Sequence, residues 1–280
     1  MAVRSWIAVA LVAALPAAGV AQVKDSTAKP PPVHRTPATR SITITYTDNA
    51  FLAPDTIPAG INTITAINQG KELHQAALVR IDSGHTTAEL LTVMKGPAPL
   101  PGWATLYGGP QNSGSVVLSL PAGNYEWVCF VPSTDGVPHF AKGMVRPLTV
   151  IAGRHNAASA PAPNLTVTMT DYTWAMTRPI RAGRQVIRVV VGVKSQPHEF
   201  MVLRLPPGKT AQDVMAWASH PVGLPPAESI MGVAPMQPGT VAYTTVTFTR
   251  GHYVLLCMVP DAKDGKPHAL HGMVKEFTIR

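Results

Sequence analysis

The sequence is poor in charged residues and in cysteine. Charged side chains occupy 14% of its 280 positions, and only two positions are cysteine. Beyond the first 21 residues, no apolar run is long enough to span a membrane as a helix. Basic residues are not interleaved with aromatic ones as they are on a nucleic-acid-binding surface, so no nucleic-acid partner is expected.

Apolar segments and turn-forming residues are plentiful instead. Hydrophobic residues make up 46% of the chain, which also contains 28 Pro and 22 Gly. Thr and Val dominate many segments, and this composition favours short strands joined by turns. The length is enough for two ordinary domains of about 120 residues each.

The first 40 residues differ from the rest. A basic start, Met1–Arg4, precedes an apolar run that ends at small residues, so residues 1–21 are expected to be a secretory signal peptide. An uncleaved N-terminal anchor is the alternative. A bacterial lipid anchor is not expected, because no Cys follows the apolar run. Residues 22–40 are rich in Pro, Thr and basic side chains and predict a flexible tether. We expect a periplasmic or secreted protein, attached to the periplasmic face of a membrane if the anchor is kept.

The rest of the chain contains two copies of one sequence. The segment that ends at Cys129 matches the segment that ends at Cys257, and similar matches extend through nearly all of residues 41–280. The offset between the copies drifts slowly, as small loop insertions would make it. The predicted organisation is a first domain over 41–153, an Ala/Pro-rich linker over 154–163 and a second domain over 164–280.

Within each copy, apolar and polar residues alternate as they do in half-buried strands. Thr86 and Glu89, and likewise Thr210 and Asp213, have the spacing of a helix capping box, which predicts one short helix per copy. The expected fold is all-β, with two tandem β-sandwiches that each contain one short inserted helix. The expected segments are strands at 61–67, 75–81, 115–120, 124–131 and 144–151 with counterparts in the second copy, helices at 86–95 and 210–219, and Gly/Pro-rich loops at 96–114 and 220–240.

The repeat selects a small set of metal-binding residue types. Of the ten His and eleven Met, only two His and one Met recur at matching positions, together with the two Cys. Asp48 with Asp171 and Arg80 with Arg204 also recur, but they suggest no metal set. The recurring pairs are His74 with His198, Cys129 with Cys257, His139 with His268, and Met144 with Met273.

These residue types form a coherent donor set. Two imidazoles and a thiolate in a trigonal arrangement, with a weak axial thioether, define a blue-copper electron-transfer site. Cys-x9-His-x4-Met occurs in the first copy and Cys-x10-His-x4-Met in the second. The end of one strand and the following loop would thus supply three ligands, and a neighbouring strand would supply the other His.

The motifs CFVPSTDGVPHFAKGM and CMVPDAKDGKPHALHGM resemble the C-terminal ligand loop of the cupredoxin family, the plastocyanin and azurin type of Greek-key β-sandwich. The Cys-to-His loop is longer than in the small carriers and closer to that of copper nitrite reductases. Gln75 and Glu199 stand where many cupredoxins have Asn. The resemblance implies one type 1 copper in each domain, held by His74, Cys129, His139 and Met144 in the first and by His198, Cys257, His268 and Met273 in the second.

Other interpretations of these residues stay open. Each Cys is also explained as a small buried hydrophobe, each His as a satisfied core group and each Met as a gap filler. His271 is an alternative ligand to His268. A Cys129–Cys257 disulfide is disfavoured, because equivalent interior points of two separate sandwiches would have to approach within about 7 Å at Cα.

The expected function is the relay of single electrons through type 1 copper, without catalysis. Multicopper oxidases and nitrite reductases require further coppers, held by His-x-His pairs or by a His beside the ligand Cys. This sequence has no His-x-His, and Val128 and Leu256 precede the two Cys.

A non-catalytic docking subunit of a membrane-bound respiratory or photosynthetic complex, with copper vacant or structural, is the alternative function. Residues 164–280 contain 12 basic and 7 acidic side chains, and the tether is basic as well. This charge suits a redox partner with an acidic surface or a membrane-bound electron-transfer complex. The sequence does not indicate an oligomeric state.

Overall fold

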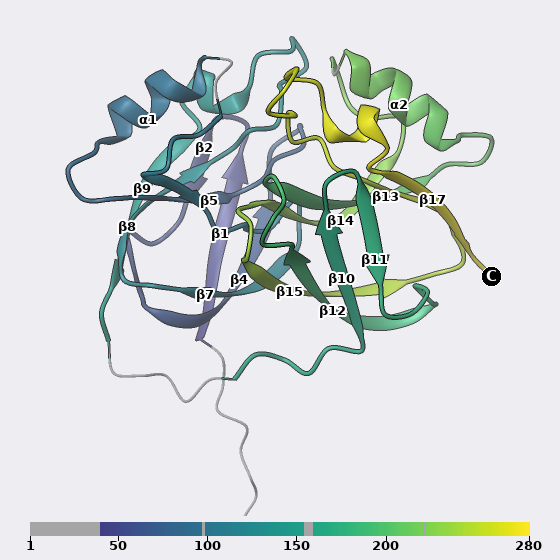
Figure 1. Cartoon of the computed structure of the whole chain (residues 1–280), viewed down its shortest axis with the longest axis horizontal. Coiled ribbons are helices and arrows are strands. Elements are labelled where there is room, and N and C mark those ends of the chain that lie inside the picture. The colour runs from purple at the N-terminus through teal and green to yellow at the C-terminus, as the bar shows by residue number, and fades with distance from the viewer. Residues whose placement is uncertain (1–39, 97–98, 154–158, 221) are drawn as a thin grey trace, which may run out of the picture. The chain divides into compact units, whose positions relative to one another are not determined.

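The strands fall into two sets that follow the sequence repeat (Figure 1). The computed structural model describes residues 40–280 except 97–98, 154–158 and 221. The predicted signal peptide, the tether up to residue 39 and residues 154–158 of the predicted linker lie outside the described residues. The domain boundaries at 153 and 164 stay a prediction.

Alternation of apolar and Thr residues produces the half-buried strands of the first repeat. In β1, Ile42, Ile44 and Tyr46 are buried, while the intervening Ser and Thr side chains are more exposed. The strands of the first repeat are β1 (Arg40–Thr47), β2 (Ala50–Leu52), β3 (Thr56–Pro58), β4 (Gly60–Asn68), β5 (Ala77–Ile81), β6 (Ala104–Leu106), β7 (Ser115–Leu120), β8 (Gly123–Val128) and β9 (Val145–Ile151).

The second repeat follows the same order, except that β3 has no counterpart strand among its described residues. Leu165, Val167 and Met169 occupy the buried positions of its first strand, matching those of β1. Its strands are β10 (Leu165–Thr170), β11 (Thr173–Met176), β12 (Gly183–Val191), β13 (His198–Leu205), β14 (Glu228–Met236), β15 (Val241–Phe248), β16 (Gly251–Leu256) and β17 (Val274–Ile279).

Each repeat forms a sandwich whose outer face is covered by one short helix. Helix α1 (Thr87–Met94) buries Leu90 against apolar side chains of β5, β6 and β8. Helix α2 (Ala211–Ser219) buries Val214 against apolar side chains of β13 and β16. Both helices begin with the predicted capping box, from Thr86 and from Thr210. The all-β prediction with one inserted helix per sandwich is therefore confirmed. No helix among the described residues is long and apolar enough to cross a membrane.

The predicted loop at 220–240 is wrong over much of its length. Residues Glu228–Met236 form β14, which pairs antiparallel with β13. Part of the 96–114 loop likewise forms β6, which pairs with β5. Gly and Pro in both segments favour turns locally, but backbone pairing with a long neighbouring strand outweighs that preference.

One sheet extends through both repeats. Its order is β11-β10-β12-β15-β7-β4-β1-β2, and the junction is the antiparallel pair β15–β7, in which Ala242 lies opposite Leu118. The other faces of the sandwiches are the sheet β3-β9-β8-β5-β6 in the first repeat and β14-β13-β16-β17 in the second. Parallel pairing of β1 with β4 and of β10 with β12 repeats the same connection in both halves.

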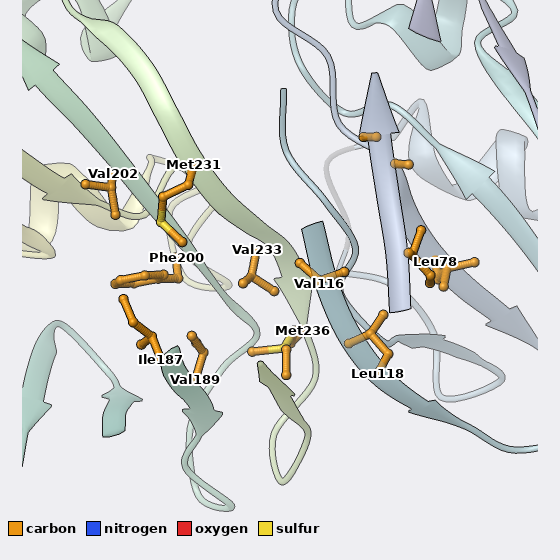
Figure 2. Close-up of a cluster of buried hydrophobic side chains, with 14 of the residues drawn as sticks. Leu78, Val116, Leu118, Ile187, Val189, Phe200, Val202, Met231, Val233 and Met236 are labelled. Atoms are coloured by element: carbon orange, nitrogen blue, oxygen red, sulfur yellow. The ribbon is translucent and has the colours of Figure 1, made fainter. Parts of the chain in front are cut away.

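The apolar core is continuous across the junction. Figure 2 shows Val233 and Met236 of β14 beside Val116 and Leu118 of β7. All four side chains are buried. A second strand-like contact joins the repeats, since Gly108 N–H donates to the carbonyl of Pro235 at 3.0 Å and Ala234 N–H donates to that of Gly109 at 2.8 Å. The repeats thus share backbone hydrogen bonds as well as apolar surface.

Candidate metal centres

The first repeat brings its predicted Cys and two His together at the ends of two adjacent strands. His74 lies just before β5, Cys129 directly follows β8, and His139 begins the short 3-10 helix η1 (His139–Lys142). The Nδ1 atoms of His139 and His74 lie 3.5 Å and 3.9 Å from Sγ of Cys129. These three donor atoms all lie within 4.8 Å of one another.

The second repeat does the same with the matching residues. His198 begins β13, Cys257 follows β16, and His268 begins η2 (His268–His271). The Nδ1 atoms of His268 and His198 lie 3.6 Å and 3.8 Å from Sγ of Cys257. The three donor atoms again lie within 4.8 Å of one another.

Both Cys are free thiols and both are buried, so the disulfide interpretation is wrong. Each Cys instead faces its own pair of imidazoles in its own sandwich.

His271 lies away from the Cys257 thiol. Its Nε2 is 3.1 Å from Oδ1 of Asp264, and its side chain is partly exposed. His268, which matches His139 in the repeat, is the one that faces Cys257.

The donor atoms have the separations that a trigonal metal site needs. A metal bound to nitrogen at about 2.0 Å and to sulfur at about 2.3 Å, with angles near 120°, places sulfur and nitrogen about 3.7 Å apart. The four sulfur–nitrogen distances lie between 3.5 and 3.9 Å. Thiolate sulfur suits Cu(I), and imidazole nitrogen suits copper in both oxidation states. The two groups therefore fit type 1 copper sites.

Backbone hydrogen bonds fix the ligand loop of the first site. The Cys129 N–H donates to the Met144 carbonyl at 3.3 Å, and the Met144 N–H donates to the His139 carbonyl at 2.9 Å. Gly143 ends η1 at φ 99°, which a residue with a side chain rarely adopts. Met144 is fully buried in the same core cluster as Cys129. The axial Met predicted from the motif is thus tied through its backbone to both other loop residues.

The second loop repeats this pattern. Cys257 N–H donates to the Met273 carbonyl at 3.2 Å, Met273 N–H donates to the His268 carbonyl at 3.0 Å, and Gly272 ends η2 at φ 107°. Met273 is fully buried. Because two different sequences adopt one bonding pattern, the pattern belongs to the motif and not to chance packing.

Solvent is excluded from both donor sets. The two Cys are completely buried, and each of the four His exposes 1% or less. Burial raises the pKa of the Cys129 thiol to about 12 and raises that of Cys257 further. A metal that binds here must therefore displace the thiol proton.

In the first site, carboxylates lie beside the outer nitrogens of both His. Nε2 of His139 is 2.6 Å from Oε2 of Glu72, whereas Nε2 of His74 is 3.8 Å from Oδ1 of Asp48. A carboxylate only accepts, so the His139 proton resides on Nε2 and its Nδ1 lone pair points toward Cys129. Burial raises the pKa of Glu72, but hydrogen bonds from Thr134, His139 and Ser133 lower it overall, to about 2.

In the second site it is the earlier His that is held closely. Nε2 of His198 lies 2.7 Å from Oγ of Ser195 and 3.2 Å from Oδ1 of Asp171. Ser195 donates its own proton to that carboxylate at 2.7 Å, so it accepts from His198. Nε2 of His268 is 3.5 Å from Oδ2 of Asp261, longer than the contact of its counterpart His139.

The two sites are therefore alike in their donors and different in their surroundings. Burial, followed by the neighbouring imidazole, lowers the pKa of His74 and of His198 to about 4. Burial also lowers the pKa of His268. Neutral imidazoles are the form that binds a metal, so these His are already in the required state near neutral pH.

Sequence reasoning missed the residues around the ligands. The recurrence of Asp48 and Asp171 was a usable signal, because each carboxylate faces the outer nitrogen of the first His in its repeat. No recurrence marks Glu72, since Gln196 occupies the matching place and instead donates to Asp261 at 2.8 Å. Burial of Gln75 and Glu199 was likewise not predicted.

A third group, Asp261, Asp264 and His271, also has closely spaced oxygen and nitrogen atoms. Asp264 and His271 are partly exposed and contact each other, while Asp261 accepts a hydrogen bond from Tyr172. Within the described part of the chain, this group and the two sites above are the sets of three or more His, Cys, Asp or Glu residues whose donor atoms lie this close together.

Comparison with known proteins gives structural neighbours only. No protein-family model and no curated protein matches the sequence. Auracyanin from Roseiflexus castenholzii is 25% identical, over 41% of this chain and 98% of its own, with a TM-score of 0.27. Auracyanin A, a blue copper protein from Chloroflexus aurantiacus, is 21% identical, over 41% of this chain and 100% of its own, with a TM-score of 0.29.

A blue copper oxidase from Nitrosomonas europaea is 13% identical, over 86% of each chain, with a TM-score of 0.23. The two auracyanins and this oxidase are proteins to which the chain is structurally similar. A blue copper protein and a blue copper oxidase both stand among them, so similarity alone does not separate a carrier from an enzyme.

Proposed function

We propose that this protein relays single electrons through two type 1 copper sites, one in each sandwich. The observation that carries the proposal is the pair of solvent-excluded His, Cys, His groups whose donor atoms lie within 4.8 Å of one another. His74, Cys129, His139 and Met144 hold one copper, and His198, Cys257, His268 and Met273 hold the other.

The arrangement suits one-electron exchange. A trigonal set of two imidazoles and a thiolate accommodates both Cu(I) and Cu(II), so little rearrangement accompanies reduction. The backbone bonds between Cys129, His139 and Met144 hold the donors in place whichever oxidation state is bound. The backbone N–H of Gln75 donates to the Cys129 sulfur at 3.4 Å, and that of Glu199 donates to the Cys257 sulfur at 3.4 Å. Hydrogen bonds of this kind to the sulfur tune the reduction potential of such a site.

The residue pattern favours a carrier over an oxidase or a nitrite reductase. Those enzymes resemble this chain in their type 1 loop but bind further coppers through His-x-His pairs or through a His next to the ligand Cys. Val128 and Leu256 occupy those neighbouring positions, and the sequence has no His-x-His. The sequence thus supplies two type 1 donor sets and neither of the patterns through which those enzymes bind their further coppers.

We infer a redox partner with an acidic surface, reached outside the cytoplasm. The excess of basic over acidic side chains in residues 164–280 would steer such a partner toward the second sandwich. A periplasmic or secreted location agrees with the predicted signal peptide. The basic tether would assist docking of the protein on a membrane-bound electron-transfer complex.

Metal loading of the full chain tests the proposal. Purified protein should take up two coppers per chain, show an intense visible absorption when oxidised, and accept two electrons reversibly. Cys129→Ser and Cys257→Ser should each remove one copper and part of the visible band, because the thiolate is the ligand that gives the band. The double variant should be colourless.

Two results would contradict the proposal. Wild-type protein that stays colourless and binds no copper would exclude a blue-copper role. Turnover of oxygen or nitrite by the loaded protein, at a rate that the double Cys variant loses, would assign it to the enzymes instead. An electron-paramagnetic-resonance spectrum of each single variant identifies which site is loaded.

A further inference from the structure

The residues that directly follow the first His of each site have buried polar side chains. Gln75 follows His74 and Glu199 follows His198, and each is 3% exposed. Burial of a carboxylate and an amide costs free energy unless they are hydrogen-bonded. Both find their partner in one residue, Gln111, which is also 3% exposed.

Gln111 joins the two side chains across the junction of the repeats. Its Nε2 group donates one hydrogen to Oε1 of Gln75 at 3.1 Å and the other to Oε2 of Glu199 at 2.7 Å. An amide nitrogen has two hydrogens, so this one atom satisfies both contacts. One side of the bridge belongs to the first repeat and the other to the second.

Each end of the bridge reaches a copper-binding sulfur. The backbone N–H of Gln75 donates to Sγ of Cys129, and that of Glu199 donates to Sγ of Cys257, both at 3.4 Å. Four hydrogen bonds and the Gln75 and Glu199 side chains therefore form a continuous connection between the two thiolates. A further bond strengthens the second end, because the N–H of Met258, next to Cys257, donates to Oε1 of Glu199 at 2.8 Å.

The fold keeps Gln111 in this position. Its backbone forms an isolated antiparallel bridge with Gln75, and its N–H donates to the carbonyl of Gly232 in β14 at 3.3 Å. Gly232 leaves the space that the amide fills, since a Cβ there would lie 1.8 Å from Oε1 of Gln111. The bridge is therefore built by residues of both repeats.

We propose that the Gln75–Gln111–Glu199 bridge carries electron exchange between the two copper sites, so that the repeats work as one two-electron unit and not as two separate carriers. One electron leaves the reduced site and enters the oxidised one, and no bond forms or breaks. The three bridge side chains are buried, and four hydrogen bonds connect them to each other and to the two sulfurs. Hydrogen-bond networks in a low-dielectric interior couple the groups they join.

The inference rests on the proposed function, because both sites must hold copper. Pulse radiolysis of the fully loaded, oxidised full chain tests it by adding less than one electron per molecule. Visible and electron-paramagnetic-resonance signals of each site are first assigned from Cys129→Ser and Cys257→Ser. In the wild type, the electron should then redistribute between the sites at a rate that does not depend on protein concentration.

Two variants break the bridge in different ways. Gln111→Met keeps the unbranched shape and removes the donor, and Gly232→Ala displaces the Gln111 amide without changing a bridge residue. Each should slow the redistribution about tenfold, equivalent to about 1.4 kcal/mol, which lies inside the range of about 0.5–2 kcal/mol over which substitutions along a network change the coupling between two sites. Thr244→Val is the matched control, because Thr244 is also buried and its hydroxyl donates across the junction to the Ser115 carbonyl and not to a bridge residue. It should leave the rate unchanged.

The outcomes separate the two levels of the proposal. Absence of copper or of reversible reduction in the wild type would overturn the proposed function itself. Two loaded, reducible sites with no concentration-independent phase would overturn only the bridge. An unchanged rate in both bridge variants, or an equal slowing in Thr244→Val, would also overturn it. If Gln111→Met does not load copper, the rate in Gly232→Ala alone tests the bridge: a slower redistribution supports it and an unchanged rate overturns it.

Discussion

The Nε2 atom of His139 lies 2.6 Å from Oε2 of Glu72. Glu72 also accepts from Ser133 and Thr134 in the same ligand loop, so one carboxylate fixes both the ring and the loop that carries it. The imidazole ring of His139 turns its Nδ1 atom toward the Cys129 sulfur. A carboxylate that orients a ligand His makes that ring a stronger donor to the metal.

Replacement of this carboxylate should weaken the first site alone. Glu72→Gln keeps the size of the side chain but removes its charge, and we expect copper affinity at the first site to fall about 10- to 100-fold. The reduction potential of that site should rise, because a negative charge near the metal stabilises Cu(II) more than Cu(I). Chelator competition and a potentiometric titration measure both effects.

The second site is the internal control for Glu72→Gln. Gln196 occupies the matching place there and contacts Asp261, so the affinity of that site should not change. Equal losses at both sites would mean that the substitution disturbs the fold and not the His139 ring.

Stability of the copper-free protein should fall as the pH drops from about 7 to 5. The folded-state pKa values of His74 and His198 are about 4, below the value of about 6.5 expected in the unfolded chain. Between these values the unfolded state binds more protons, so each His lowers the free energy of unfolding by up to about 1.4 kcal/mol per pH unit. His268, whose pKa is also lowered, acts in the same direction.

Glu199 opposes this trend and offers a control. Burial raises its pKa to about 7, so below that pH the folded state binds the additional proton and gains stability. Glu199→Gln should therefore make the acid-induced loss steeper. Urea denaturation of copper-free wild type and variant at several pH values measures the slopes. Equal stability of the wild type at pH 7 and pH 5, with no steeper loss in the variant, would contradict the assignment.

Much of the fold and the donor set could be predicted because both copies of the sequence repeat contain the same pattern. Recurrence singled out His74 and His139, with their counterparts His198 and His268, from the other His. The structure brings each pair together with the Cys of its own repeat. Capping boxes at Thr86 and Thr210 located both helices, because the cap needs specific side chains at a fixed spacing.

Features that depend on contacts between the repeats could not be predicted in this way. The pattern of Glu228–Met236 looks like a loop, and it becomes a strand only because β13 and the segment ending at Gln111 lie on either side of it. Gln111 itself has no recurring partner, and its role appears only when Gln75 and Glu199 are seen to meet. Residues that recur in both repeats can therefore be recognised in the sequence, whereas residues that join one repeat to the other cannot.

Gly109 should tolerate substitution far less well than Gly60. Both have a positive φ, 153° and 100°, so each Gly→Ala change strains the backbone at a cost of about 1 kcal/mol. A Cβ at Gly109 would also lie 1.8 Å from the Ala76 carbonyl oxygen, whereas one at Gly60 meets nothing within 4 Å. Gly109→Ala should therefore cost about 3 kcal/mol or more in free energy of unfolding.

Urea denaturation of the two glycine variants measures this difference. Gly60→Ala is the control for backbone strain without a clash. Equal losses for both would mean that the segment around Gly109 moves away from Ala76 at no cost, and that the junction between the repeats is loosely held.

The second repeat by itself should be unstable and prone to associate. Residues 164–280 alone would lose the β7 partner of β15 and leave its backbone unpaired along one edge. Val233 and Met236, fully buried in the whole chain, would lose their cover from the first repeat. An unpaired apolar edge is a template for pairing with another copy, so we expect oligomers in size-exclusion chromatography and a lower urea midpoint than in the full chain.

A charge on the exposed edge separates edge pairing from general unfolding. Tyr243 lies opposite Val117 in the whole chain, so Tyr243→Lys places an ammonium group on the edge that the isolated repeat exposes. Edge lysines oppose strand pairing, and the variant should return the isolated repeat toward a monomer without raising its urea midpoint. A monomeric, unmodified 164–280 with the midpoint of the full chain would instead mean that each predicted domain folds independently and that the shared sheet adds little to stability.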